Sequence, residues 1–158
     1  MIRSLCSNDK IFIQEILTGT GFFSPLEIAT ALELIDDFLN NPATTYQIFV
    51  SADDINPDTV TGYICYGKNP LSYATYELYW IAVAPGYQKK GVGKALMHFF
   101  EERIKEERGI NILIETSSKI EYESTRKFYL TLDYKQLSIV ENFYAPGDAR
   151  ITYIKVIN

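Results

Sequence analysis

The feature that most constrains the fold of this chain is a predicted strand, a glycine-containing turn and a predicted helix in direct succession. The segment from Glu77 to Pro85 is rich in aromatic and β-branched residues, which favour a strand. After the turn, Leu96, Phe100 and Ile104 recur every four residues and therefore share one face of a helix. The first amides of a helix lack internal acceptors, and glycines let the backbone approach a ligand, so this unit predicts an anion-binding turn.

The turn reads Gln88-Lys89-Lys90-Gly91-Val92-Gly93, and two common nucleotide-binding loops do not fit it. The Walker A loop requires lysine and then serine or threonine after its second glycine, but valine and glycine follow Gly91. The dinucleotide-binding fingerprint requires a third glycine where Leu96 stands. The segment does fit the pattern Gln-x-x-Gly-x-Gly placed directly after a strand that ends in Ile81-Ala82-Val83.

This pattern resembles the acetyl-CoA pyrophosphate loop of the GNAT superfamily of N-acetyltransferases. The resemblance implies that the loop amides face the pyrophosphate and that backbone groups of the preceding strand bind the pantetheine arm. The two loop lysines either attract phosphate by their charge or are ordinary solvated side chains. The residues that the resemblance assigns to acetyl-CoA are Ile81, Ala82, Val83, Gln88, Lys89, Lys90, Gly91, Val92, Gly93 and Lys94.

The length of 158 residues, with 47% hydrophobic and 22% charged residues, is typical of one globular domain, which we expect to span residues 1–158. The net charge of -5 argues against nonspecific nucleic-acid binding, because that binding depends on basic contacts to phosphate. An acidic protein is compatible with a cationic substrate such as an amine, although acidity also serves solubility.

Cys6 and Cys65 are too few for a disulfide framework, and Cys65 lies in a strand-like run, as expected of a buried thiol. The start of the chain turns polar at once, and no apolar run approaches about 18 residues, so we expect neither a signal peptide nor a membrane span. His98 has no histidine or cysteine at metal-binding spacing. The resulting prediction is a cytoplasmic protein, monomer or homodimer, without a metal, nucleic-acid or membrane partner.

The hydrophobic periodicity predicts the element order β-α-α-β-β-β-α-β-α-β-β. The second helix starts at Ser24-Pro25 and stops at Asn40-Asn41-Pro42, and we expect Gly19 and Gly21 to end the first helix. We expect residues 142–149 to form a loop with a Pro146-Gly147 turn. The other predicted helices span 9–18, 92–108 and 121–132, and the predicted strands span 1–5, 46–52, 59–67, 75–84, 111–116, 134–143 and 150–157.

This order resembles the GNAT fold from end to end. The resemblance implies an α/β (α+β) architecture in which a mixed central sheet of about seven strands is flanked by about four helices.

Acetyl transfer requires that the amine lose a proton, since a lysine-like amine has a pKa of about 10. The thioester oxygen must also be stabilised, and the leaving thiolate must be protonated. By the resemblance, Glu77 is a general base or a substrate anchor, and the alternative is a structural strand residue. Tyr129 is the general acid at the sulfur, and the alternative is a core tyrosine. Asp133 stands where the family typically has glycine, and Tyr122 stands where many members have an asparagine that contacts CoA.

The segment from Glu141 to Asp148 resembles a loop found in a group of small bacterial and archaeal acetyltransferases. In it, Tyr144 and Asp148 either rim the acceptor pocket or only form a Pro-Gly turn. The sequence therefore predicts an acetyl-CoA-dependent N-acetyltransferase in which a primary amine, small or on a protein, attacks directly in a ternary complex. The alternatives are a catalytically inactive CoA-binding regulatory module and, more distantly, a nucleotide-binding protein.

Overall fold

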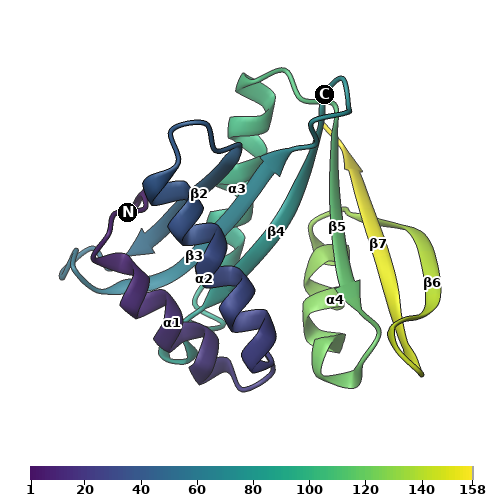
Figure 1. The fold of residues 1–158 in the computed structure, drawn as a ribbon, viewed down its shortest axis with the longest axis horizontal. Coiled ribbons are helices and arrows are strands. Elements are labelled where there is room, and N and C mark those ends of the chain that lie inside the picture. Colours follow the sequence, from purple (N-terminus) through teal and green to yellow (C-terminus); the bar gives the residue numbers. More distant parts are fainter. Residues whose placement is uncertain (158) are drawn as a thin grey trace.

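Seven strands within residues 1–157, the part of the chain that the computed structural model describes, form one mixed sheet (Figure 1). Their order in the sheet is β1-β2-β3-β4-β5-β7-β6. Every neighbouring pair is antiparallel except β4 and β5, which run parallel. The bounds are β1 (Ile2–Ser4), β2 (Tyr46–Ala52), β3 (Val60–Lys68), β4 (Thr75–Val83), β5 (Asn111–Ser117), β6 (Lys135–Ala145) and β7 (Asp148–Val156).

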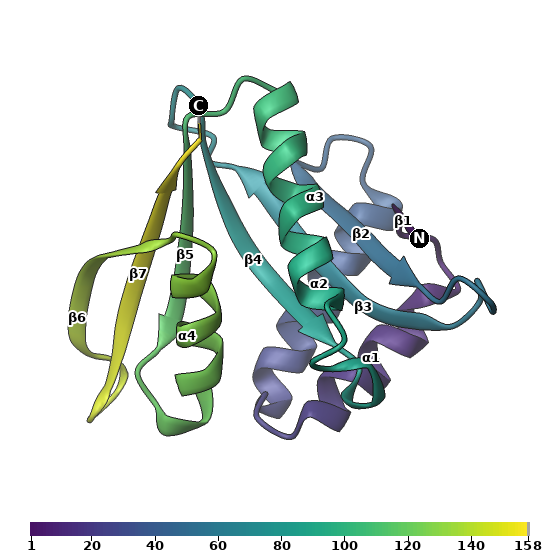
Figure 2. The ribbon, with the colours of Figure 1, turned by 180° about the vertical axis from the view of Figure 1, so that it is seen from behind.

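Four α-helices of the described residues cover the two faces of the sheet. Helices α1 and α2 lie on the face turned toward the viewer in Figure 1, which we call the front face, and α3 and α4 lie on the back face (Figure 2). The predicted mixed sheet with seven strands and four helices is confirmed. No described helix is long and apolar enough to cross a membrane. The bounds are α1 (Asp9–Thr20), α2 (Pro25–Asn40), α3 (Val92–Glu106) and α4 (Glu123–Thr131), with short 3-10 turns η1 (Pro85–Tyr87) and η2 (Ile120–Tyr122).

Two apolar clusters fasten the helices to the sheet. The periodic residues Leu96, Phe100 and Ile104 of α3 are 0% exposed and belong to the back cluster. The front cluster lies beneath α1 and α2, and Ile13 and Ile35 are among its buried members. Burying large apolar side chains on both faces fixes the helices against the sheet, since each such side chain contributes about 1.5–3 kcal/mol.

Strands β4 and β5 pair over only part of their length. The ladder runs from Thr75 opposite Asn111 to Leu78 opposite Ile114 and then stops. Beyond that point β4 stays paired with β3 on its other side, whereas β5 stays paired with β7. The two strands diverge in Figure 1, so the facing backbone edges of their last residues have no ladder partner in the described chain.

A β-bulge at Tyr79 changes which residues of β4 face the front. Cys65 lies opposite Trp80 while Tyr66 lies opposite Leu78, so Tyr79 is the extra residue. Because Leu78 belongs to the back cluster, the preceding Glu77 points to the front. Trp80 packs against the front cluster, so the bulge reverses the alternation of the strand at this point.

The predicted end of the first helix is wrong. Helix α1 continues through Gly19 to Thr20, and Gly21 follows with a left-handed φ of 80°. A glycine inside a helix costs about 1 kcal/mol relative to alanine, which the burial of Ile16 and Leu17 outweighs. Gly19 also lies close to η1, because a Cβ at this position would be 3.5 Å from the Pro85 ring.

The predicted loop at residues 142–149 is also wrong, except for its turn. Strand β6 continues to Ala145, which pairs with Asp148, so only Pro146 and Gly147 connect β6 and β7. The register shifts between Val140 and Ala145, and Asn142 takes a φ of 55° within this irregular stretch. The residues between Val140 and Ala145 therefore form a bulge in the pairing with β7, although the local sequence pattern predicted a loop.

Candidate active site

The predicted catalytic residues and the loop 88–93 lie on both faces of the sheet around β4 and β5. Glu77 lies opposite Leu113, one residue before the ladder ends, and points to the front. The loop 88–93 and the start of α3 follow β4 on the back face (Figure 2). Tyr129 on α4 belongs to the back cluster. The predicted base and the predicted acid therefore lie on opposite faces of the sheet.

The loop 88–93 presents the N-terminus of α3. Gly91 is the cap residue, with a left-handed φ of 86°, and no side chain bonds to the cap. The first backbone bond of the helix runs from the amide of Ala95 to the carbonyl of Gly91, at 2.9 Å. The preceding amides, those of Val92, Gly93 and Lys94, have no protein acceptor within the described chain. They form the partly positive end of the helix, which suits an anion.

Neighbouring side chains fix this loop in place. The Gln88 side-chain amide donates to the Val83 carbonyl at 3.3 Å, and the Tyr87 hydroxyl donates to Asp53 at 3.2 Å. The Lys90 ammonium lies 5.3 Å from the centre of the Tyr87 ring, and no carboxylate of residues 1–157 forms an ion pair with it or with Lys89. Both lysines are exposed, and their charges remain available to an anion at the helix N-terminus.

Two side chains donate to the carboxylate of Glu77. The Tyr79 hydroxyl lies 3.1 Å from Oε2, and Asn69 Nδ2 lies 3.4 Å from Oε1. Burial raises the pKa of Tyr79, and the charge of Glu77 adds to this shift. The sequence interpretation missed Tyr79, although two residues of separation in a strand place side chains on one face.

Tyr129 is 4% exposed and packs among aromatic rings. Its ring centre lies 6.1 Å from that of Tyr134 and 6.0 Å from that of Tyr153. Burial raises the pKa of Tyr129, so its hydroxyl stays protonated through neutral pH. Asp133, which replaces a typical glycine after α4, takes a φ of 65°, so this turn forms with aspartate in the left-handed conformation.

The two predicted acceptor residues differ in their surroundings. Tyr144 is 49% exposed on β6, whereas Asp148 is 5% exposed at the start of β7. The Asp148 carboxylate accepts a hydrogen bond from the Ser117 hydroxyl, and the Lys119 ammonium lies 3.7 Å from it. Asp148 thus ties the β6–β7 turn to the end of β5, and Tyr144 is the more accessible of the two.

A contact that no local sequence pattern predicts connects α2 and η2. The Tyr122 hydroxyl donates to Glu27 Oε2 at 3.1 Å, although 95 residues separate them. Burial raises the pKa of Tyr122, and the charge of Glu27 adds to the shift. Within residues 1–157, no group of three or more histidine, cysteine, aspartate or glutamate side chains is arranged to hold a metal ion.

Comparison with known proteins gives a consistent result. The family model described as the Acetyltransferase (GNAT) family matches residues 13–134. The crystal structure of a protein assigned to the GNAT family, from Desulfovibrio desulfuricans, is 32% identical and has a TM-score of 0.93. The match covers 100% of this chain and 99% of that one. No curated protein matches the sequence significantly.

Two more distant structures share the fold. An aminoglycoside 6'-N-acetyltransferase complexed with coenzyme A is 19% identical, with a TM-score of 0.75 and coverage of 100% of this chain and 97% of that one. The ribosomal-protein-S18-alanine N-acetyltransferase from Escherichia coli is 19% identical, with a TM-score of 0.77 and coverage of 100% and 94%. At this identity the likeness concerns the architecture alone.

Replacing Gly91 tests whether the loop 88–93 binds the phosphates of coenzyme A. We expect Gly91→Glu to weaken binding of acetyl-CoA by about tenfold or more, because the carboxylate places negative charge at the free amides of α3. Isothermal titration calorimetry measures the dissociation constant.

The matched control is Gly147→Glu. Gly147 has a φ of 81° against 86° for Gly91, and at neither position would a Cβ meet another atom within 4 Å. The two variants therefore share the backbone strain and the change of charge, and only their distance from α3 differs. Equal affinity for acetyl-CoA in both variants would exclude loop 88–93 as the phosphate site.

Proposed function

This chain belongs to the acetyltransferase (GNAT) family, and we propose that it transfers the acetyl group of acetyl-CoA to a primary amine by direct attack in a ternary complex. The observation that carries the proposal is the divergence of β4 and β5. The carboxylate of Glu77 lies on the front face, and the free amides at the start of α3 and the buried Tyr129 lie on the back face. We call the stretch beyond Leu78 and Ile114, where β4 and β5 are unpaired, the opening, and we propose that the two substrates approach it from opposite faces of the sheet.

The residues around the opening fit acetyl-CoA, which supplies the thioester. The amides of Val92, Gly93 and Lys94 would hold the pyrophosphate, with Lys89 and Lys90 nearby as unneutralised charges. The free backbone edge of β4 would bind the amides of the pantetheine arm at Ile81, Ala82 and Val83. These backbone groups need a partner, because unpaired polar groups are costly when water is excluded.

The front face would supply the proton acceptor. A primary ammonium cannot attack, since its nitrogen lone pair is bound to a proton, and its pKa of about 10 keeps it so at neutral pH. Glu77 takes that proton, directly or through water, and the neutral amine attacks the carbonyl carbon. The hydrogen bonds from Tyr79 and Asn69 restrict the orientation of the carboxylate.

The back face would supply the hydrogen-bond donor for the leaving sulfur. Because burial raises the pKa of Tyr129, its hydroxyl keeps its proton over the pH range in which thiolates form. It can therefore stabilise the developing thiolate by donating a hydrogen bond, and the proton transfer to sulfur that we propose takes place against the raised pKa of the phenol. On the front face, Tyr144 is the accessible candidate for contact with the acceptor, and Asp148 fixes the turn beside it.

Direct attack agrees with the state of the two thiols. Cys65 is buried, and this burial raises its pKa to about 12, so it carries little thiolate. The Cys6 thiol donates to Asp9 at the start of α1 and contacts none of the residues around the opening. We therefore propose transfer without an acyl-enzyme intermediate.

The proposal extends to the domain and to the location of the protein. We propose that residues 1–158 form one acetyltransferase domain, which the single sheet from β1 to β7 and the full-length match to the Desulfovibrio structure support. The absence of a disulfide between Cys6 and Cys65 is compatible with a reducing cytoplasm.

An assay of binding and turnover tests the proposal. Purified protein is titrated with acetyl-CoA and then incubated with a panel of small amines and peptides that carry free amines, while release of the CoA thiol is followed. We expect binding in the micromolar range and amine-dependent thiol release. Binding without product from any amine would favour a regulatory CoA-binding module, and absence of binding would overturn the proposal.

Glu77→Gln tests the proton acceptor. We expect kcat/KM for the amine to fall by about 10²–10⁴, with loss of the acid limb of its pH profile, because glutamine cannot take a proton. The control is Glu107→Gln, which removes another carboxylate that accepts a tyrosine hydroxyl, at 2.8 Å from Tyr76. A higher KM with unchanged kcat would instead identify Glu77 as a substrate anchor.

Tyr129→Phe tests the donor at the sulfur. We expect kcat to fall by about 10²-fold or more while the dissociation constant for acetyl-CoA stays the same, because only the hydroxyl is removed. Tyr134→Phe is the control, since that buried neighbour also has a hydroxyl without a partner in the described chain. Equal kcat values for the two variants would assign Tyr129 to the core alone.

A further inference from the structure

Tyr79 lies at the irregularity of β4. It is the extra residue of the bulge, because Cys65 and Tyr66 on β3 pair with the residues on either side of it. Tyr79 faces the front like Glu77 two residues earlier, and the bulge turns the next side chain, Trp80, to the front as well. Tyr79 is 38% exposed, so part of its surface faces solvent near the end of the β4–β5 ladder.

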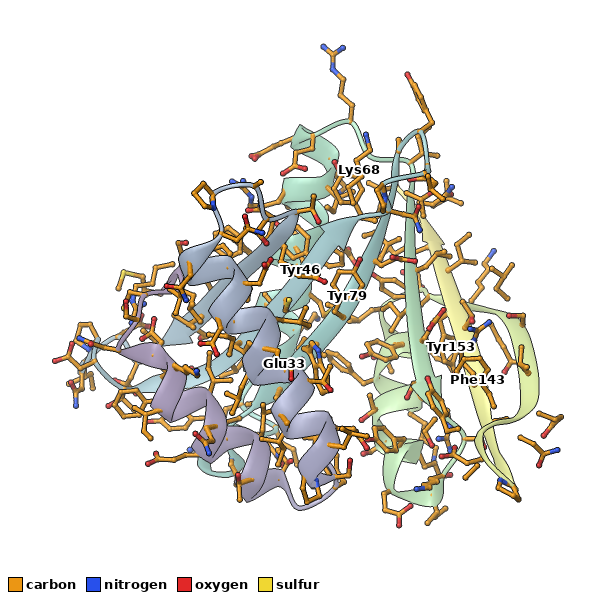
Figure 3. The ribbon with its side chains drawn as sticks, viewed as in Figure 1. Glu33, Tyr46, Lys68, Tyr79, Phe143 and Tyr153 are labelled. Atoms are coloured by element: carbon orange, nitrogen blue, oxygen red, sulfur yellow. The ribbon has the colours of Figure 1, made fainter. Side chains whose placement is uncertain are left out.

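Neighbouring strands make room for the Tyr79 ring and hold it. A Cβ at Gly67 on β3 would lie only 3.1 Å from the ring atom Cε2 of Tyr79, so any larger residue there would crowd the ring. On β2, Tyr46 packs edge-on, with ring centres 5.6 Å apart. Figure 3 shows Tyr46 and Tyr79 next to each other on the front face of the sheet. Three strands therefore fix the plane of this ring.

The fixed ring directs its hydroxyl to the carboxylate of Glu77. The hydroxyl lies 3.1 Å from Oε2, and Oε1 has a longer contact, 3.4 Å from Asn69 Nδ2. A glutamate on an otherwise open strand surface has several accessible rotamers, and a catalytic carboxylate must keep one. Burial, with the charge of Glu77 in addition, raises the pKa of Tyr79, which keeps the phenol protonated and able to donate.

We propose that Tyr79 is a positioning residue that holds Glu77 in the orientation for accepting the proton of the amine. This inference rests on the proposed function of Glu77. With Oε2 bonded to Tyr79, Oε1 is the oxygen that takes the proton: the N–H bond of the ammonium breaks, an O–H bond forms at Oε1, and the electron pair remains on nitrogen to attack the acetyl carbon. Tyr79 itself exchanges no proton in this step.

Tyr79→Phe tests the proposal, because it removes the hydroxyl and keeps the ring between Gly67 and Tyr46. We expect kcat/KM for the amine to fall by about tenfold, mainly through kcat, with the affinity for acetyl-CoA unchanged.

The matched control is Tyr76→Phe. Tyr76 lies on the same strand, points to the opposite face and donates to Glu107 at 2.8 Å, so the variant removes a similar hydroxyl-to-carboxylate bond away from the opening. Unchanged kcat and kcat/KM in Tyr79→Phe would overturn the proposal, as would a loss equal to that of the control.

A double-mutant cycle with Glu77→Gln separates positioning from direct contact with the substrate. If Tyr79 acts through Glu77, adding Tyr79→Phe to the Glu77→Gln variant should cause less than a twofold further loss. A further tenfold loss would mean that Tyr79 acts on the substrate itself and would overturn the proposal. If Glu77→Gln has no effect in the first place, the proposed role of Glu77 fails and the positioning role fails with it.

Discussion

The short pairing between β4 and β5 is the constraint on which the rest of the structure depends. The ladder ends at Leu78 and Ile114, and beyond it each strand is held by a different neighbour, β3 or β7. The edges that face each other across the opening carry backbone donors and acceptors without a ladder partner. An extended ligand with amide groups of its own would satisfy them as a strand would, which is the basis for the pantetheine site that we propose.

The bulge at Tyr79 and the alternation of β4 divide the chemistry between the two faces of the sheet. Glu77 points to the front. The next residue, Leu78, points to the back and belongs to the same apolar cluster as Tyr129. Because the two groups lie on opposite faces, the hydroxyl of Tyr129 forms no hydrogen bond with the carboxylate of Glu77. In the reaction that we propose, Glu77 would receive a proton from the incoming amine on one face, and Tyr129 would serve the leaving sulfur from the other.

The sequence predicted correctly those parts of the fold and of the candidate site that depend only on residues close together in the chain. The helix period placed Leu96 and Phe100 in the core, and the glycine of the loop adopts the left-handed φ that caps α3. The bulge escaped prediction because it depends on the register with β3, where the missing side chain of Gly67 makes room for Tyr79. The end of α1 and the length of β6 were predicted wrongly for a similar reason. Packing continues α1 through Gly19, and pairing with β7 continues β6 to Ala145, although the local glycine and turn residues predicted earlier ends.

Tertiary contacts also join the two halves of the sheet where β4 and β5 are unpaired. At one end the β4–β5 ladder joins the two halves of the sheet. Away from the ladder a row of aromatic rings crosses from β4 to η2: Trp80 to Phe23 at 5.6 Å, Phe23 to Phe22 at 4.9 Å, and Phe22 to Tyr122 at 5.7 Å. The bond from Tyr122 to Glu27 reinforces this row. The two halves of the sheet are therefore joined at two separate places, by the backbone ladder and by side-chain packing, and the second connection depends on residues that are far apart in the sequence.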